Sequence, residues 1–179
     1  MAKAFGIVNT SGNHIWVEGM QNYRPIGAFS FLGRYRVIDF SISNMSNSEI
    51  ERIQVFAGNN PRSLIEHLGI GRQYDINPKT GKLQILFSES HSKNDIYNTD
   101  IAAFYENLDS IQKMKEEYVV IAPSYMVFAM DFEKLLNEHI ESNADITLLY
   151  HSVEDANVKE KFITTAEDGS FKLNAPLPA

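Results

Sequence analysis

A chain of 179 residues with 44% hydrophobic and 22% charged residues is long enough to bury one ordinary core and too apolar to be disordered. Its net charge of −7, with no basic block to offset it, argues against a nucleic-acid-binding surface. The absence of cysteine excludes disulfides and thiolate metal sites, and together with a sequence that shows neither a signal peptide nor a membrane span it predicts a cytoplasmic protein.

The first half of the chain predicts two strands and a helix. Apolar runs at Ala4–Asn9 and Ile53–Phe56 have the length and composition of short strands. Asn60 and Pro61 supply a cap and a first-turn proline for the helix that follows, and Gly69 is placed to end it. The apolar face of this helix is expected to consist of Leu64, Ile65 and Leu68.

The middle of the chain continues the alternation. Leu83–Phe87 is strand-like, and a helix is predicted from Asp100 to about Lys113, because apolar residues recur there at helical spacing. Those apolar residues are Phe104, Leu108 and Ile111. Tyr118–Ile121 is a continuous apolar run, which is typical of a strand covered on both faces.

The last third predicts one helix and three strands. Asp131 caps a helix whose buried stripe consists of Phe132, Leu135, Leu136 and Ile140. Ile146–Tyr150 is predicted to be a strand. Lys161–Thr165 and Phe171–Leu173 flank the turn residues Asp168 and Gly169, which indicates a hairpin.

Strands that alternate with helices predict an α/β fold with a mostly parallel sheet and helices on both faces. Ligands of such sheets bind beyond the carboxyl ends of the strands. The loops after Val8, Phe56 and Ile121 are therefore expected to share one rim, where any functional site would lie.

The most informative segment is the run from Gly33 to Asn44, GRYRVIDFSISN. Arg34 and Arg36 carry guanidinium groups, which suit bidentate contacts with phosphate or carboxylate. Asp39 follows an aliphatic pair and leads into a helical turn. Two interpretations remain open from these residues: an anion-handling site, or an internal Arg36–Asp39 ion pair beside a packed segment.

This run, extended through Asn47 and Ser48 to Ile50, closely resembles the signature of bacterial glucose-1-phosphate adenylyltransferases, the ADP-glucose pyrophosphorylases. The resemblance implies a three-layer, nucleotidyltransferase-like (Rossmann-like) domain in which Arg24, Arg34, Arg36 and Asp39 are candidates for binding phosphate or substrate. It also makes Tyr97 a candidate contact for the nucleotide, although an ordinary packing role fits Tyr97 equally well.

The chain departs from the catalytic members of that family in three places. Where they have a glycine-rich phosphate loop ending in arginine, residues 9–14 read NTSGNH, with one glycine. Ile26 stands at the position of the family's lysine, although Arg24 is retained. Ser124 stands at the position of the aspartate that binds catalytic magnesium, and a neutral hydroxyl is a poor ligand for a hard cation.

Together these losses resemble the non-catalytic D-type subunits (GlgD) of the family. The resemblance implies a regulatory chain with no catalytic residue and no metal site of its own, partnered by a catalytic subunit; magnesium and ATP are expected for the holoenzyme. Two alternatives stay open. One is an active adenylyltransferase in which the three arginines hold phosphates, and the other is a sensor of a nucleotide or sugar phosphate without turnover.

The same resemblance implies that residues 1–179 form one nucleotidyltransferase-like domain, truncated because the family's C-terminal left-handed β-helix has no counterpart here. The histidines form no metal-ligand spacing. Structural roles are favoured for His67, which lies within a predicted helix, and for His139, which lies beside an apolar stripe.

Overall fold

The computed structural model describes residues 4–10, 17–58, 60–77, 79, 81–87, 100–150, 162–165 and 171–174. The chain divides into two compact units, Met1–Asn143 and Ala144–Ala179, and each is described by itself. That residues 1–179 form one domain stays a prediction. Within the described residues, no helix is both long and apolar enough to cross a bilayer.

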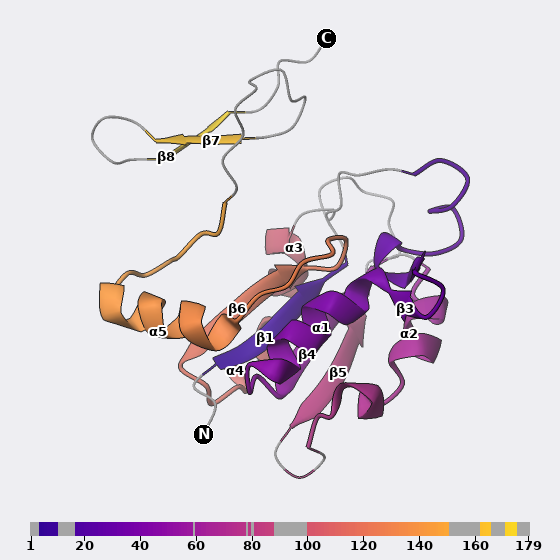
Figure 1. Ribbon diagram of the computed structural model, residues 1–179, viewed down its shortest axis with the longest axis horizontal. Coiled ribbons are helices and arrows are strands. Elements are labelled where there is room, and N and C mark those ends of the chain that lie inside the picture. The colour runs from indigo at the N-terminus through magenta and orange to yellow at the C-terminus, as the bar shows by residue number, and fades with distance from the viewer. Residues whose placement is uncertain are drawn as a thin grey trace. The chain divides into compact units, whose positions relative to one another are not determined.

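The first unit is built on a four-stranded sheet in the order β5-β4-β1-β6 (Figure 1). Its strands are β1 (Ala4–Asn9), β4 (Arg52–Ala57), β5 (Lys82–Phe87) and β6 (Tyr118–Pro123). All three strand pairs are parallel, as the alternation of strands and helices predicts. The order of the strands along the chain reverses between β1 and β6, which makes this the topological switch point of the sheet.

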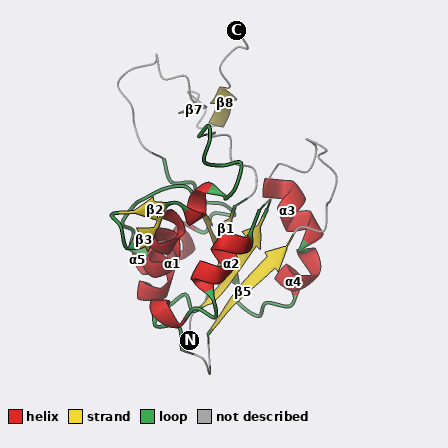
Figure 2. Ribbon diagram, turned by 90° about the vertical axis from the view of Figure 1, so that its right-hand side faces the viewer, coloured by secondary structure: helices red, strands yellow, loops and turns green. Residues whose placement is uncertain are grey.

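Helices cover both faces of this sheet, so the predicted three-layer α/β fold is confirmed (Figure 2). One face packs against α1 (Val37–Asn47), α2 (Arg62–Leu68) and α5 (Phe132–Ser142). The other face packs against α3 (Asp100–Glu106) and α4 (Leu108–Gln112). The side chains of β1 alternate between the two cores: Val8 joins the first, and Phe5 and Ile7 join the second.

Four short elements complete the first unit. They are the 3₁₀ turns η1 (Ile26–Ala28) and η2 (Arg72–Tyr74), and the strands β2 (Ser30–Phe31) and β3 (Tyr35–Arg36). β2 and β3 form an antiparallel hairpin directly before α1. Arg24 precedes the turn η1, Arg34 lies between β2 and β3, and Arg36 ends β3 directly before α1.

The predicted helix from Asp100 to Lys113 is two helices that meet at Asn107. The side-chain amide of Asn107 donates to the carbonyl of Ala103 at 2.9 Å, and its φ and ψ of −104° and 17° are not helical. An asparagine side chain competes with the helical backbone for hydrogen bonds, which explains the break. Leu108, which was expected on the buried stripe, is exposed.

The prediction that β6 is covered on both faces is wrong. Its residues Val119 and Ile121 are 44% and 51% exposed, whereas Val120 packs against the core under α1 and α5. β6 lies at the edge of the sheet, beyond the area that α3 and α4 cover. Ile65 was likewise expected to be buried with Leu64 and Leu68, and it is exposed.

In the second unit, β7 (Phe162–Thr165) and β8 (Phe171–Asn174) pair antiparallel, as predicted for a hairpin. The strand predicted at Ile146–Tyr150 is wrong, because these residues are described and have no regular structure. An apolar run becomes a strand only where a partner pairs with it, and no described strand pairs with this run.

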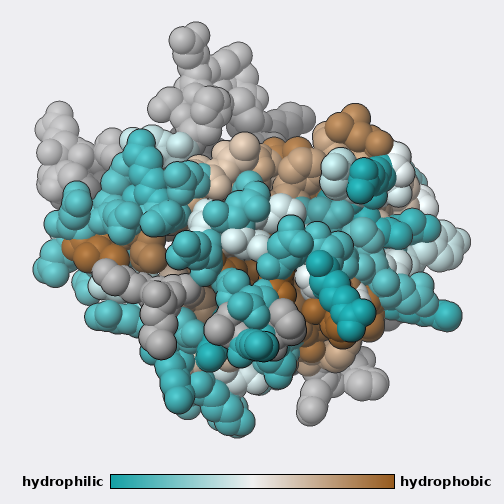
Figure 3. All heavy atoms as spheres, turned by 60° about the horizontal axis from the view of Figure 1, so that its bottom comes forward, coloured by the Kyte–Doolittle hydropathy of each residue, from teal (hydrophilic) through white to brown (hydrophobic). Residues whose placement is uncertain are grey.

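The face of the molecule in Figure 3 is mostly hydrophilic, with separate hydrophobic patches, which is ordinary for a protein surface.

Candidate functional site

The carboxyl ends of β1, β4 and β6 meet at one rim, as expected from the parallel sheet. The amide of Thr10 donates to the carbonyl of Phe56 at 3.0 Å, and the amide of Ser124 donates to the carbonyl of Asn9 at 3.3 Å. The second contact joins the ends of β1 and β6, the switch point where doubly wound sheets bind their ligands. Ser11, Gly12 and Asn13 of the degenerate loop lie outside the described residues.

The protein's own groups satisfy the polar side chains at the end of β1. The hydroxyl of Thr10 donates to the carbonyl of Phe56 at 2.8 Å and accepts from the amide of Gly58 at 2.9 Å. The amide of Asn9 donates to Asp100, the first residue of α3, at 2.5 Å. The start of the loop after β1 is therefore tied to the rim by its side chains.

Ser124 is sealed inside the protein at the end of β6. It is 2% exposed, and a Cβ added to Gly27 would lie 3.2 Å from both its Cβ and its carbonyl oxygen. The hydroxyl of Ser41 on α1 donates to the neighbouring carbonyl of Pro123 at 2.6 Å. The turn η1, with Ile26 buried in it, thus lies directly on the switch point.

Magnesium does not fit this position. The ion requires several oxygen ligands in near-octahedral geometry and usually keeps water molecules, whereas Ser124 offers one neutral hydroxyl in a closed environment. Among the residues that the structure describes, no group of three histidine, aspartate or glutamate side chains could hold a metal ion.

The three candidate arginines remain accessible to an external anion. Arg24 and Arg34 are exposed, and the guanidinium of Arg34 lies 5.8 Å from the centre of the Tyr35 ring. Arg36 is half-buried, and its Nη1 donates to the carbonyl of Ala28 in η1. A guanidinium carries five N–H donors, so this one bond leaves Arg36 with further donors for an anion.

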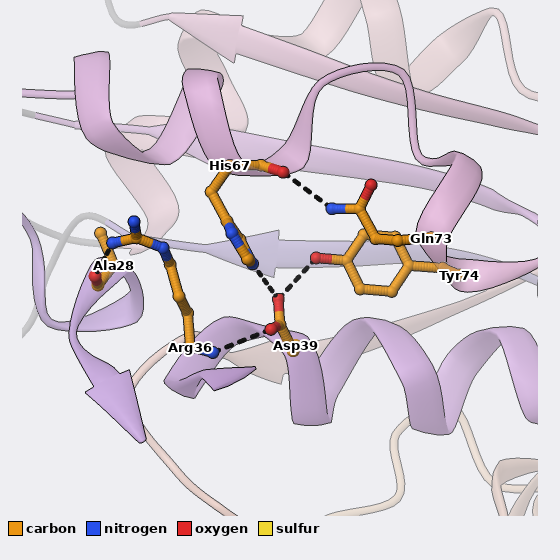
Figure 4. A network of polar contacts seen from close by, with 6 residues as sticks. All are labelled: Ala28, Arg36, Asp39, His67, Gln73 and Tyr74. Carbon is orange, nitrogen blue, oxygen red and sulfur yellow. Dashed lines mark hydrogen bonds and ion pairs between the residues drawn. The ribbon is translucent and has the colours of Figure 1, made fainter. Parts of the chain in front are cut away.

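Asp39 is buried and accepts three hydrogen bonds from the protein (Figure 4). Its Oδ2 accepts from the main-chain amide of Arg36 at 2.8 Å, which caps the start of α1. Its Oδ1 accepts from the hydroxyl of Tyr74 at 2.6 Å and lies 2.6 Å from Nε2 of His67. Of the two sequence interpretations, the ion pair is therefore replaced by a capping contact, and a ligand role for Asp39 stays a prediction.

Tyr74 is the member of this network that sequence analysis missed. Burial, together with the hydrogen bond to Asp39, raises the pKa of Tyr74 above its ordinary value, so the phenol keeps its proton and acts as a donor. Thirty-five positions separate Tyr74 from Asp39, and no spacing rule relates them. The structural role favoured for His67 agrees with its contact to Asp39, and His139 lies edge-on to the Tyr118 ring. Tyr97 lies outside the described residues.

Comparisons with known proteins agree with this fold. The nucleotidyl transferase family model matches residues 20–162. "Glycogen biosynthesis protein GlgD" of Geobacillus stearothermophilus is 35% identical over 155 residues, which cover 83% of this chain and 44% of the relative. The GlgD of Bacillus subtilis is 29% identical over 164 residues, covering 91% of this chain and 48% of that protein.

A catalytic name occurs among the relatives as well. "Glucose-1-phosphate adenylyltransferase" of Clostridium novyi is 35% identical over 152 residues, which cover 83% of this chain and 38% of the relative. The chain thus spans less than half the length of each of these three relatives. The resemblance inferred from the Gly33–Ile50 motif is confirmed, and the chain belongs to the nucleotidyl transferase family.

Proposed function

We propose that this chain is the nucleotidyltransferase-like part of a non-catalytic, regulatory subunit of glucose-1-phosphate adenylyltransferase, acting in glycogen biosynthesis in the cytoplasm. Its partner is a catalytic subunit, and the assembled enzyme converts ATP and glucose 1-phosphate into ADP-glucose and diphosphate with magnesium. Similarity to proteins named GlgD and to proteins named glucose-1-phosphate adenylyltransferase supports the assignment to this system.

The sealed position of Ser124 carries the non-catalytic part of the proposal. At the switch point a nucleotidyltransferase needs room and charge for a metal-bound nucleotide, and here η1 closes over a neutral side chain. Ile26 is buried in that same turn, where the family's lysine would present a cation. Removing one group that stabilises charge in a transition state already lowers a rate by about 10²–10³.

The exposed arginines support retention of an anion-binding function. Among the residues that the structure describes, Arg24 makes no hydrogen bond or ion pair, and Arg36 keeps donors that none of these residues uses. A phosphate group suits such guanidinium donors. Weak binding of inorganic phosphate or of a sugar phosphate, without turnover, is the chemistry that these side chains can still perform.

Two measurements test the proposal. ADP-glucose formation is assayed with the purified chain, ATP, magnesium and glucose 1-phosphate; we expect none. The chain is then mixed with the catalytic subunit encoded in the same genome, and we expect a hetero-oligomer by sedimentation and an altered rate of ADP-glucose synthesis. Arg62→Ala, which removes only an exposed i,i+4 ion pair, is a control that should leave both results unchanged.

Two results contradict the proposal. Robust turnover by the chain alone would make it an enzyme with a divergent site. Absence of any complex with the catalytic subunit, at concentrations where the chain is folded, would remove the regulatory role.

A further inference from the structure

We infer that His67 and Tyr74 are positioning residues for Arg36, acting through Asp39, and that they set how strongly this region binds a phosphate. The inference rests on the proposed function, in which Arg36 is one of the anion-binding side chains. It extends the candidate site from the motif on β3 and α1 to α2 and η2, which sequence analysis did not connect with it.

The first step is the burial of a carboxylate. Asp39 is 8% exposed, and a buried carboxylate is costly unless donors surround it. Two of its three partners, His67 and Tyr74, meet the same oxygen, Oδ1. Because an ionised carboxylate only accepts hydrogen bonds, Nε2 of His67 must carry its hydrogen in this contact.

The second step concerns the direction of the Arg36 side chain. Its main-chain amide meets Asp39, but its guanidinium points away from the carboxylate and bonds the carbonyl of Ala28 (Figure 4). A guanidinium next to an unsatisfied carboxylate would form an ion pair with it. Since His67 and Tyr74 already satisfy Oδ1, Arg36 is left to hold η1 and to offer its other donors outward.

The third step is the response to losing a donor. Without His67 or the hydroxyl of Tyr74, Oδ1 loses one of its two partners, and Arg36 is the nearest cation in sequence, three positions before Asp39. The flexible guanidinium would turn from Ala28 to Asp39. Its charge would then be neutralised within the protein, and phosphate binding would weaken although the fold persists.

The experiment measures the dissociation constant of inorganic phosphate by calorimetry for the 179-residue chain and for a set of variants, at low salt and where each variant is folded by circular dichroism. His67→Leu and Tyr74→Phe should weaken binding by about threefold to thirtyfold, the range found for residues that act through others. His67→Gln, which keeps an N–H donor, should restore most of the affinity. His139→Leu, the same change on α5, should have no effect.

The outcomes separate the inference from the function on which it rests. If the wild-type chain binds no phosphate, the positioning role and the anion-binding part of the proposed function are overturned, whereas the regulatory role is still decided by the complex and turnover measurements. If Arg36→Ala leaves binding unchanged, Arg36 is not one of the anion-binding side chains and the positioning role is overturned. If Arg36→Ala abolishes binding while Tyr74→Phe and folded His67→Leu bind as the wild type does, the positioning role alone is overturned. Should His67→Leu fail to fold, Tyr74→Phe, which removes a single hydroxyl, decides the question by the same comparison.

Discussion

At the rim of the sheet, side chains form hydrogen bonds with, or pack against, other parts of the protein. Thr10 links the ends of β1 and β4, Ser124 lies beneath Gly27, and Asp39 holds donors from three elements. At the residue scale, Ser124 and Asp39 are thus part of the packing and the hydrogen bonding of the protein. Reversing such a change requires more than restoring the chemical group, because the space around it is filled.

Ser124→Asp should reduce the free energy of unfolding by about 3 kcal/mol, because it places an unpaired carboxylate in a closed environment. Denaturation by urea measures the change. Ser30→Asp makes the same substitution at an exposed position and should alter stability little. A stable Ser124→Asp variant that bound magnesium would show that the site opens more easily than its packing indicates.

In the wild type, the free energy of unfolding should fall as the pH rises above about 10, and Tyr74→Phe should make this fall less steep. The folded-state pKa of Tyr74 is raised, so its contribution is fully present below the unfolded-state pKa of about 10 and is lost as the pH rises above it. Above that pH the unfolded chain releases the proton and the folded chain retains it. The slopes of unfolding free energy against pH of the two proteins should differ by at most about 1.4 kcal/mol per pH unit, which is the value for one proton released on unfolding.

Urea denaturation between about pH 9 and pH 11.5 measures these slopes over the range in which tyrosine titrates. Tyr105→Phe, at a side chain that is 79% exposed, is the matched control and should keep the wild-type slope. Equal slopes for Tyr74→Phe and the wild type would contradict the buried, proton-donating role of Tyr74.

At the scale of elements, the short turn η1 closes the end of β6 and contacts Arg36. Its residues Ile26 and Ala28 are buried, and Gly27 allows its backbone to approach β6 closely. The carbonyl of Ala28 also accepts from Arg36, so this turn joins the motif hairpin to the rim. This three-residue turn thereby connects Arg36 to the end of β6.

Gly27→Ala should destabilise the chain by about 1–3 kcal/mol, because the new methyl group would lie 3.2 Å from Ser124 and 3.4 Å from Ile38. The amide resonance of Ser124 should move with it in NMR spectra. Gly33→Ala, where space is open and φ is +74°, should cost about 1 kcal/mol through backbone strain and leave the Ser124 resonance in place. An unshifted Ser124 in Gly27→Ala would contradict the close packing.

At the scale of the whole molecule, the strand order places β1 and β6 side by side with parallel ends, which defines where this fold binds ligands. The nucleotidyl transferase family model matches residues 20–162, and the proposed function holds that the catalytic groups at the ligand-binding rim are replaced. Loss at several separated positions affects catalysis as a unit, since catalytic groups that act together are strongly non-additive.

Ser124→Asp combined with Ile26→Lys should therefore produce no ADP-glucose. Replacing residues 9–13 by a glycine-rich loop ending in arginine, together with both reversions and in a protein that carries the remaining length of its relatives, should produce measurable transfer. A radiochemical assay of ADP-glucose compares these variants. Substantial turnover by Ser124→Asp alone would contradict both the need for the loop and the sealed state of this position.

Local sequence patterns predicted most of the secondary structure, the rim of the sheet and the family of this protein. The strands Ala4–Asn9 and Leu83–Phe87, the helix capped by Asp131, and the shared rim of the parallel sheet all follow from periodicity, capping and chain order, which act within a few neighbouring residues. The family was predicted from one motif, Gly33–Ile50, and the family match over residues 20–162 confirms it. The same local rules failed at Asn107, where a side chain competes with the helix, and at Ile146–Tyr150, which needs a pairing partner.

Tertiary structure alone decided the role of each polar residue. The sequence identified Asp39, His67 and Ser124 as positions of interest. It did not show that His67, 28 positions further along the chain, contacts Asp39, or that Gly27 of η1 packs against Ser124. Burial and hydrogen bonding between distant segments depend on how whole elements pack, and no local pattern encodes those contacts. That packing is what turns a recognisable nucleotidyltransferase motif into a closed rim beside exposed arginines.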